Sequence, residues 1–107
     1  MICVVLVSAP AGAPARELAR ELVERRHAAC VSVIPGVHSV YRWQGKVEEA
    51  AEDLLVIKTH RSAIERLEAV TLELHPYDVP EFIVLDIDQG LPPYLQWVAD
   101  QVLGESE

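Results

Sequence analysis

The fold of this chain is decided by one stretch, residues 28–59, which reads AACVSVIPGVHSVYRWQGKVEEAAEDLLVIKT. The run from Cys30 to Trp43 is rich in Val, Ile, Tyr and Trp, the residues that favour extended strands. Gly45 follows and can adopt the positive φ angle that a tight hairpin turn requires. The chain then returns through Val47 and the apolar run Leu54–Lys58. This pattern predicts one long β-hairpin.

The predicted hairpin is longer than the domain that would hold it. A strand of about 14 residues spans roughly 45 Å at about 3.3 Å per residue. A compact domain of this length is only about 30–35 Å across. Unless Pro35-Gly36 interrupts the ribbon, its end projects with Tyr41 and Trp43 uncovered. Large exposed apolar ends mark contact surfaces, so we expect a homo-oligomer.

The remaining segments alternate between strand and helix patterns. A short apolar run at residues 2–7 predicts a strand buried on both faces, and residues 82–87 predict the last strand. Helices are predicted at residues 13–26, at residues 62–75 with a capping box in Ser62-Ala63-Ile64-Glu65, and after Pro92-Pro93. The order β-α-β-β-α-β plus a C-terminal helix predicts one α+β, ferredoxin-like domain over residues 1–107, with a long protruding hairpin between its second and third strands.

Composition excludes several classes of partner. The chain has 9 basic and 17 acidic residues, a net charge of −8, which argues against binding to a phosphate backbone and so against nucleic acid. No stretch approaches the 18 or so apolar residues of a membrane span, and the first residues lack an export signal. Cys3 and Cys30 lie in strands that are not neighbours in this fold, so no disulfide is expected and a cytoplasmic location fits.

Metal-ligating side chains are concentrated in His75-Pro76-Tyr77-Asp78-Val79-Pro80-Glu81. Imidazole suits copper or zinc, a carboxylate can complete the shell, and the thiolate of Cys30 suits Cu(I), so His75, Glu81 and Cys30 are candidate metal ligands. Plainer interpretations stay open. His75 can bind the last carbonyls of a helix, Glu81 can form a salt bridge, and Cys30 can serve as a small apolar core residue. No cofactor is expected to be required for folding.

A run of acidic residues precedes the apolar part of the returning strand. Glu48, Glu49, Glu52 and Asp53 are expected to protect a sheet edge against unwanted pairing.

The sequence of this hairpin, together with later segments, closely resembles that of the CutA family of divalent-cation tolerance proteins. The resemblance is carried by Ala28–Val31, by Pro35–Lys46, by Ile57-Lys58-Thr59, by His75–Glu81 and by Tyr94–Trp97, in this order along nearly the whole chain. It implies a ferredoxin-like fold, a tight homotrimer, and a link to copper and other divalent cations. It does not imply a known catalytic reaction. Some family members carry Cys where this chain has Val7 and His where it has Leu74, so two ligands of that arrangement are missing here.

The resemblance also implies that Tyr41, Trp43, Lys58 and Tyr77 lie around clefts between subunits. These residues are interpreted either as anchors of the trimer or as a ligand site in which Lys58 contacts an anion. Two functions follow: a non-enzymatic trimer concerned with divalent metal and cation tolerance, or a trimeric small-ligand sensor similar to nitrogen-regulatory proteins. A hydrolase using His75 with Tyr77 or Glu81 is disfavoured, because no known catalytic motif is present and the chain contains no asparagine.

Overall fold

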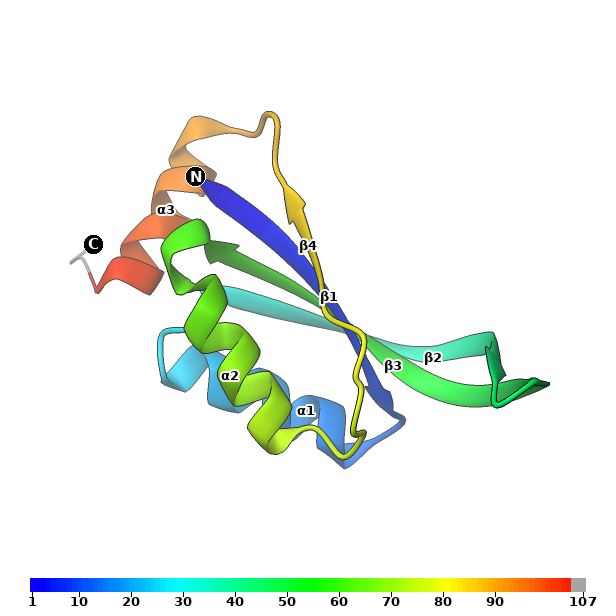
Figure 1. The fold of residues 1–107 in the computed structure, drawn as a ribbon. Coiled ribbons are helices and arrows are strands. Elements are labelled where there is room, and N and C mark those ends of the chain that lie inside the picture. Colours follow the sequence, from blue (N-terminus) through cyan, green and yellow to red (C-terminus); the bar gives the residue numbers. More distant parts are fainter. Residues whose placement is uncertain (105–107) are drawn as a thin grey trace.

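The computed structural model describes residues 1–104 and has the element order expected from the sequence (Figure 1). The elements are β1 (Ile2–Pro10), α1 (Ala13–Glu24), β2 (Cys30–Trp43), β3 (Lys46–His60), a short 3-10 turn η1 (Arg61–Ala63), α2 (Ile64–Leu74), β4 (Ile83–Asp86) and α3 (Pro92–Leu103). The predicted α+β, ferredoxin-like fold is confirmed. The last residues of the predicted domain, 105–107, lie outside the described part.

The strands form one antiparallel sheet in the order β2-β3-β1-β4, and α1 and α2 cover one of its faces (Figure 1). Because side chains alternate along a strand, Val5 and Val7 of β1 point toward these helices together with Leu55 and Ile57 of β3. All four are fully buried. The core is completed from the helices by a set of buried apolar residues: Ala15, Leu18, Ala19, Leu22, Leu67 and Val70.

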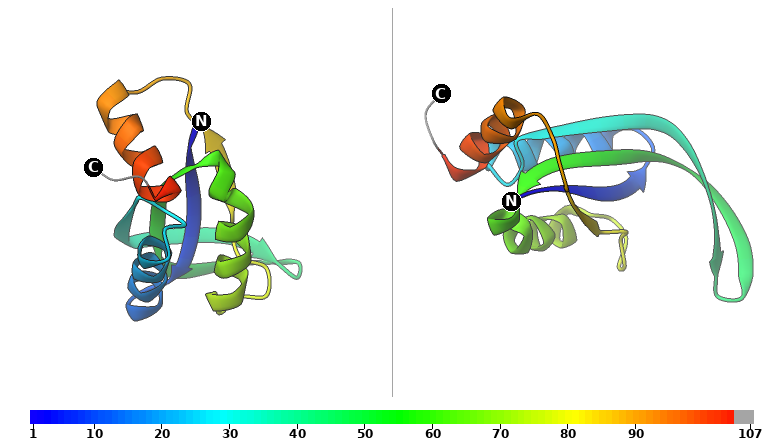
Figure 2. Two further views of the ribbon diagram at one scale, coloured as in Figure 1. Left: turned by 90° about the vertical axis from the view of Figure 1, so that its left-hand side faces the viewer. Right: turned by 90° about the horizontal axis from the view of Figure 1, so that it is seen from above.

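The hairpin of β2 and β3 leaves the domain as predicted, and the molecule measures 48 × 26 × 23 Å. Trp43 pairs with Lys46 across a two-residue turn, in which Gln44 and Gly45 have φ angles of 49° and 80°. Positive φ at both central positions is the geometry that matches the twist of paired strands. Pro35-Gly36 does not break the ribbon but forms a bulge between Ile34 and Val37. Figure 2 shows the hairpin curving away from the sheet.

The second face of the sheet has no helix over most of its area, and we call it the open face. Cross-strand pairing places its side chains in rows, for example Ile83, Leu6, Val56 and Ser32, and next to them Leu85, Val4, Lys58 and Cys30. α3 covers only one end, where Ile2, Ala29 and Ala63 pack with Val98 and Val102. Ile34, Ile83 and Leu85 remain 46–48% exposed.

Three local expectations were wrong. The first strand is fully buried on one face only, because Val4 and Leu6 lie on the open face. Ser62-Ala63-Ile64-Glu65 does not form a capping box: the 3-10 turn precedes α2, and the Nδ1 atom of His60 accepts the Ser62 N–H.

Two of the acidic residues expected at a sheet edge are also buried instead. Glu52 and Asp53 are 6% and 3% exposed, because β3 lies between β2 and β1. The Oδ2 atom of Asp53 accepts the Gly12 N–H at 3.0 Å, which ties the base of the hairpin to the start of α1.

Candidate functional site

A groove of about 820 Å³ lies where the hairpin leaves the sheet. One wall is the inner side of the hairpin, and the other is the segment between α2 and β4. It is lined by Ser8 of β1, by Ser39, Val40, Tyr41 and Trp43 of β2, by Glu52 of β3, and by Tyr77, Asp78, Val79, Pro80 and Glu81. Its volume is typical of a small-molecule binding site.

The strand register explains which hairpin side chains face the groove. Tyr41 pairs with Glu48 and Ser39 with Ala50, and beyond them Val37 pairs with Glu52. Paired residues point to the same side of an antiparallel ribbon, so Ser39, Tyr41 and Glu52 share one face. Trp43 comes after Tyr41 and Arg42 on β2, and alternation along the strand places it on the same face as Tyr41. The side chains of Tyr41 and Trp43 are 44% and 56% exposed, so their rings are available for contact.

His75 holds the second wall of the groove in place. The imidazole is 7% exposed, and its Nδ1 accepts the Tyr77 N–H at 3.1 Å. The ring proton must therefore lie on Nε2, which donates to the carbonyl oxygen of Ser8 at 2.7 Å. The ring centroids of His75 and Tyr77 are 4.8 Å apart. Both nitrogens are thus occupied by backbone groups, and His75 connects the end of α2 to β1.

Glu52, Tyr77 and Glu81 are electrostatically linked. The Tyr77 hydroxyl donates to the Oε2 atom of Glu52 at 3.2 Å. Burial raises the pKa of Tyr77, and the negative charge and hydrogen bond of Glu52 raise it further. Partial burial of the Glu81 carboxyl group raises its pKa as well, with a second contribution from the charge of Glu52, although most of this side chain is exposed. Lys, Arg and His form no salt bridge with these carboxylates within residues 1–104.

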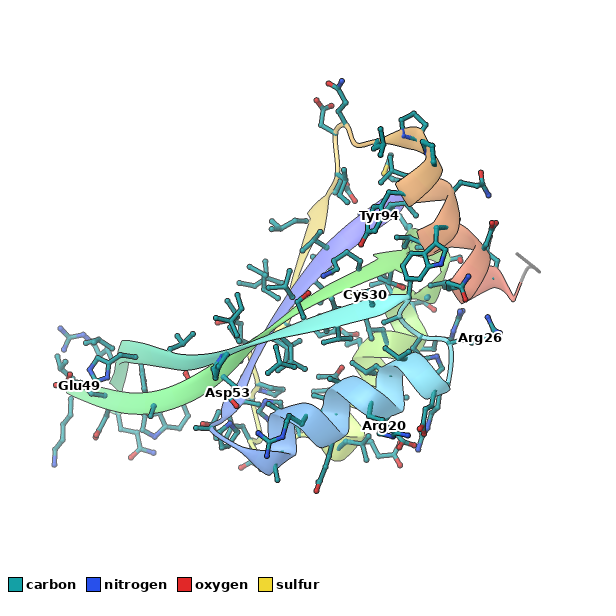
Figure 3. The ribbon with its side chains drawn as sticks, turned by 180° about the vertical axis from the view of Figure 1, so that it is seen from behind. Arg20, Arg26, Cys30, Glu49, Asp53 and Tyr94 are labelled. Carbon is teal, nitrogen blue, oxygen red and sulfur yellow. The ribbon has the colours of Figure 1, made fainter. Side chains whose placement is uncertain are left out.

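The structure brings some of the predicted site residues together and separates others. Tyr41, Trp43, Tyr77 and Glu81 all line the groove. Lys58 does not, because it lies further along β3, away from the hairpin, and its Nζ donates to Ser32 Oγ at 2.8 Å. Cys30 is paired with Lys58 at the start of β2, near Tyr94 and far from the hairpin tip that Glu49 marks (Figure 3). Over the described residues, no group of three or more His, Cys, Asp and Glu side chains is arranged to hold a metal ion.

Sequence reasoning missed Glu52, Ser8 and Ser39 as groove residues. A signal for Glu52 was present, because counting back from the Trp43–Lys46 pair at the turn puts it opposite Val37 and on the face of Tyr41. No comparable signal exists for Ser8, which meets the groove only because β1 and the segment after α2 are brought together in three dimensions.

An antiparallel β2-β3-β1-β4 sheet with two helices on one face defines a ferredoxin-like α+β protein. The sequence matches the family model described as CutA1 divalent ion tolerance protein over residues 3–101. This chain therefore belongs to the CutA1 family, which confirms the resemblance found in its sequence.

Relatives and solved structures agree with this assignment. The chain is 46% identical over 97 residues to the divalent-cation tolerance protein CutA of Thermus thermophilus, covering 91% of this chain and 94% of that protein. The solved Thermus structure superimposes with a TM-score of 0.92, covering 94% and 98% of the two chains. A Nostoc structure titled PII-like protein CutA in apo form gives a TM-score of 0.88 at 38% identity, covering 94% and 97%.

Vertebrate relatives are longer. The chain is 51% identical over 96 residues to the CutA homolog of Xenopus laevis, covering 90% of this chain. It spans 64% of the length of that protein and about half the length of the mouse and human CutA proteins. Relatives differ in location by name: the Arabidopsis protein is chloroplastic and an Archaeoglobus structure is titled periplasmic. In this chain, the helices of residues 1–104 are all too short or too polar to cross a membrane.

The raised pKa of Glu81 predicts a pH-dependent effect of Glu81→Gln. A folded-state pKa above the unfolded value gives a stabilising contribution that is complete below about pH 4.3 and is lost as the pH rises through the folded pKa. We therefore expect Glu81→Gln to raise Tm at pH 7 and to leave it unchanged below about pH 4. The gain should be under about 1 kcal/mol, because this side chain is exposed and water screens its charge. Glu68→Gln on the exposed side of α2 is the control, and an equal gain in both variants would contradict the assignment.

The two backbone contacts of His75 predict a loss of stability in His75→Ala. The substitution leaves the Ser8 carbonyl and the Tyr77 N–H without their partners, at a cost of roughly 1–3 kcal/mol. Chemical denaturation measures this loss. His38→Ala is the control, because the exposed His38–Glu49 pair contributes little. Equal stability of the two variants would show that His75 is not a structural connection.

Proposed function

We propose that this protein is a homotrimer that acts in divalent-cation tolerance without catalysing a reaction. The observation that carries the proposal is the open face of the sheet. Family membership supplies the link to divalent cations, and the resemblance of the hairpin sequence supplies the number of subunits. A cytoplasmic location belongs to the same proposal and is consistent with Cys3 and Cys30 being free thiols.

The open face exposes a contiguous apolar surface to water, which is unfavourable. Leu6, Val56, Leu54, Ile34, Ile83 and Leu85 lie on it in adjacent rows, interrupted by Ser8, Ser32 and Lys58. Soluble monomers rarely leave a contiguous apolar surface of this kind uncovered. Further copies of the chain would bury these rows, and the projecting hairpin, in a molecule 48 Å long, would offer an additional contact surface.

A metal role for His75, Glu81 and Cys30 stays a prediction, and the fit of these residues is poor within one subunit. Both ring nitrogens of His75 bind backbone groups, and neither His75 nor Cys30 lines the groove with Glu81. A tight divalent site built from them would need ligands from more than one subunit or a rotated His75.

A second candidate function is small-ligand sensing in the groove, in a cleft between subunits. It is favoured by the volume of about 820 Å³ and by the aromatic rings of Tyr41, Trp43 and Tyr77 at its walls. The Nostoc structure, to which this chain is 38% identical, is titled a PII-like protein. Fold likeness alone does not assign the function, so the groove residues carry this candidate.

The trimer is tested by placing a charge on the open face. We expect wild-type protein to be trimeric in native mass spectrometry and Ile83→Glu to shift it toward monomer, because a buried unpaired carboxylate is costly. Leu72→Glu is the matched control, since Leu72 on α2 is 54% exposed and Ile83 is 47% exposed. A monomeric wild type, or a trimer that Ile83→Glu leaves intact, would exclude the open face as the interface.

Copper titration tests the metal role on the same samples. We expect copper to be held weakly and below one ion per subunit, because both nitrogens of His75 are occupied. Native mass spectrometry after addition of one equivalent of Cu(II), followed by a chelator wash, measures the stoichiometry. One firmly held ion per subunit in wild type that is lost in His75→Ala would show that His75 turns away from Ser8 to bind metal.

A further inference from the structure

The charged side chains that line the groove within residues 1–104 are all acidic. Its lining contains the carboxylates of Glu52, Asp78 and Glu81 and no Lys, Arg or His. Its remaining walls are largely aromatic, from Tyr41, Trp43 and Tyr77. The groove thus combines negative charge with flat apolar surfaces, and these two properties favour the same class of ligand.

Glu52 is the unusual member of this set. Its side chain is 6% exposed, and buried carboxylates are normally paired with a cation. Its Oε2 accepts the Tyr77 hydroxyl, while Oε1 accepts no hydrogen bond from any described residue. Among residues 1–104, every fully buried side-chain oxygen has a hydrogen-bond partner. Oε1 of Glu52 has none, so this atom is not fully buried. Glu81 lies close enough for the charge of Glu52 to act on it.

We propose that the groove binds an organic ammonium ion, whose charged nitrogen is received by Glu52 and Glu81 and whose carbon body packs against Tyr41, Trp43 and Tyr77. This inference rests on the proposed small-ligand function and names its ligand class. Aromatic faces attract organic cations, and a carboxylate strengthens the hydrogen bond to an ammonium group. Ser8 and Ser39 add hydroxyl groups at the same wall.

Other ligand classes fit the groove less well. An anion would meet two or more carboxylates and no basic side chain among residues 1–104, because Lys58 lies next to Ser32, further along β3 and outside the groove. A small divalent cation requires several oxygen ligands converging on one point, and the described side chains form no such group. Three aromatic rings contribute little to a hydrated metal ion, whereas they cover the carbon body of an organic cation.

The test compares three ligands of equal length on the intact trimer: hexamethylenediamine, hexanediol and adipate. Isothermal titration calorimetry is done in about 0.15 M NaCl, which limits the diffuse attraction of an acidic surface for any cation. We expect the diamine to bind saturably, and the neutral diol and the dianion not to bind. A similar response to all three ligands, or to adipate alone, overturns the assignment.

Variants locate the binding site. Glu52→Gln keeps the hydrogen-bond acceptor for Tyr77 and should weaken diamine binding about tenfold or more, since hydrogen bonds to charged groups contribute that much. Glu81→Gln should weaken it in the same direction, and Trp43→Leu about threefold or more. Glu68→Gln on α2 removes the same charge outside the groove and should leave binding unchanged. Equal weakening by Glu52→Gln and Glu68→Gln would mean diffuse surface attraction and overturn the proposal.

Native mass spectrometry with the diamine present distinguishes a failure of this inference from a failure of the proposed function. A trimer that does not bind the diamine overturns the organic ammonium site and leaves the proposed homotrimer intact. The same result is expected if a neighbouring subunit fills the groove. A monomer overturns the proposed homotrimer whatever the diamine does.

Discussion

The four-stranded sheet is apolar on both of its faces, but α1 and α2 cover only one of them, and most of the structure follows from this asymmetry. Val5 and Val7 point into the core while Leu6, between them, points to the open face. Apolar residues therefore occur at both the odd-numbered and the even-numbered positions of β1 and β3, as in a strand that is packed on both faces. α3 supplies only a partial second layer, at the end where Ile2 meets Val98 and Val102. The sequence thus encodes an apolar surface that the described part of the chain leaves largely uncovered.

The groove depends on a second constraint, the connection that His75 makes between distant parts of the chain. Ser8 and His75 are 67 residues apart, and their hydrogen bond places the end of α2 against β1. The same ring then binds the Tyr77 N–H, so that the tyrosine hydroxyl reaches Glu52 on β3. A residue whose type first indicated metal binding therefore acts through its hydrogen bonds, and it positions one wall of the site.

The parts of this structure that follow local rules could be predicted from the sequence. Strand alternation, Gly45 at the turn and the proline at the start of α3 fixed the order of elements and the projecting hairpin. The capping box failed because another local hydrogen bond replaces it: the Ser62 N–H donates to the side chain of His60, two residues earlier, and a 3-10 turn precedes α2. Glu52 was misinterpreted for a related reason: an acidic residue on a strand is normally solvated, and its burial depends on Tyr77, which is distant in sequence. The hydrogen bond from Lys58 to Ser32 likewise could not be predicted, because it depends on how β2 and β3 are aligned in the folded sheet.

The ionised carboxylate of Glu81 is disfavoured in the folded chain, and this property points to binding. Partial burial and the charge of Glu52 raise the pKa of Glu81, so the ionised form of Glu81 is less favourable in the folded chain than in the unfolded chain. A purely structural site would gain by replacing one carboxylate with an amide or an apolar side chain. Perturbed carboxyl groups in a cleft are instead characteristic of functional sites, where a ligand supplies the missing opposite charge. Since the groove opens on the same side of the sheet as the apolar rows, the proposed assembly and the proposed ligand binding would occur next to each other, and a bound cation would relieve the repulsion between Glu52 and Glu81.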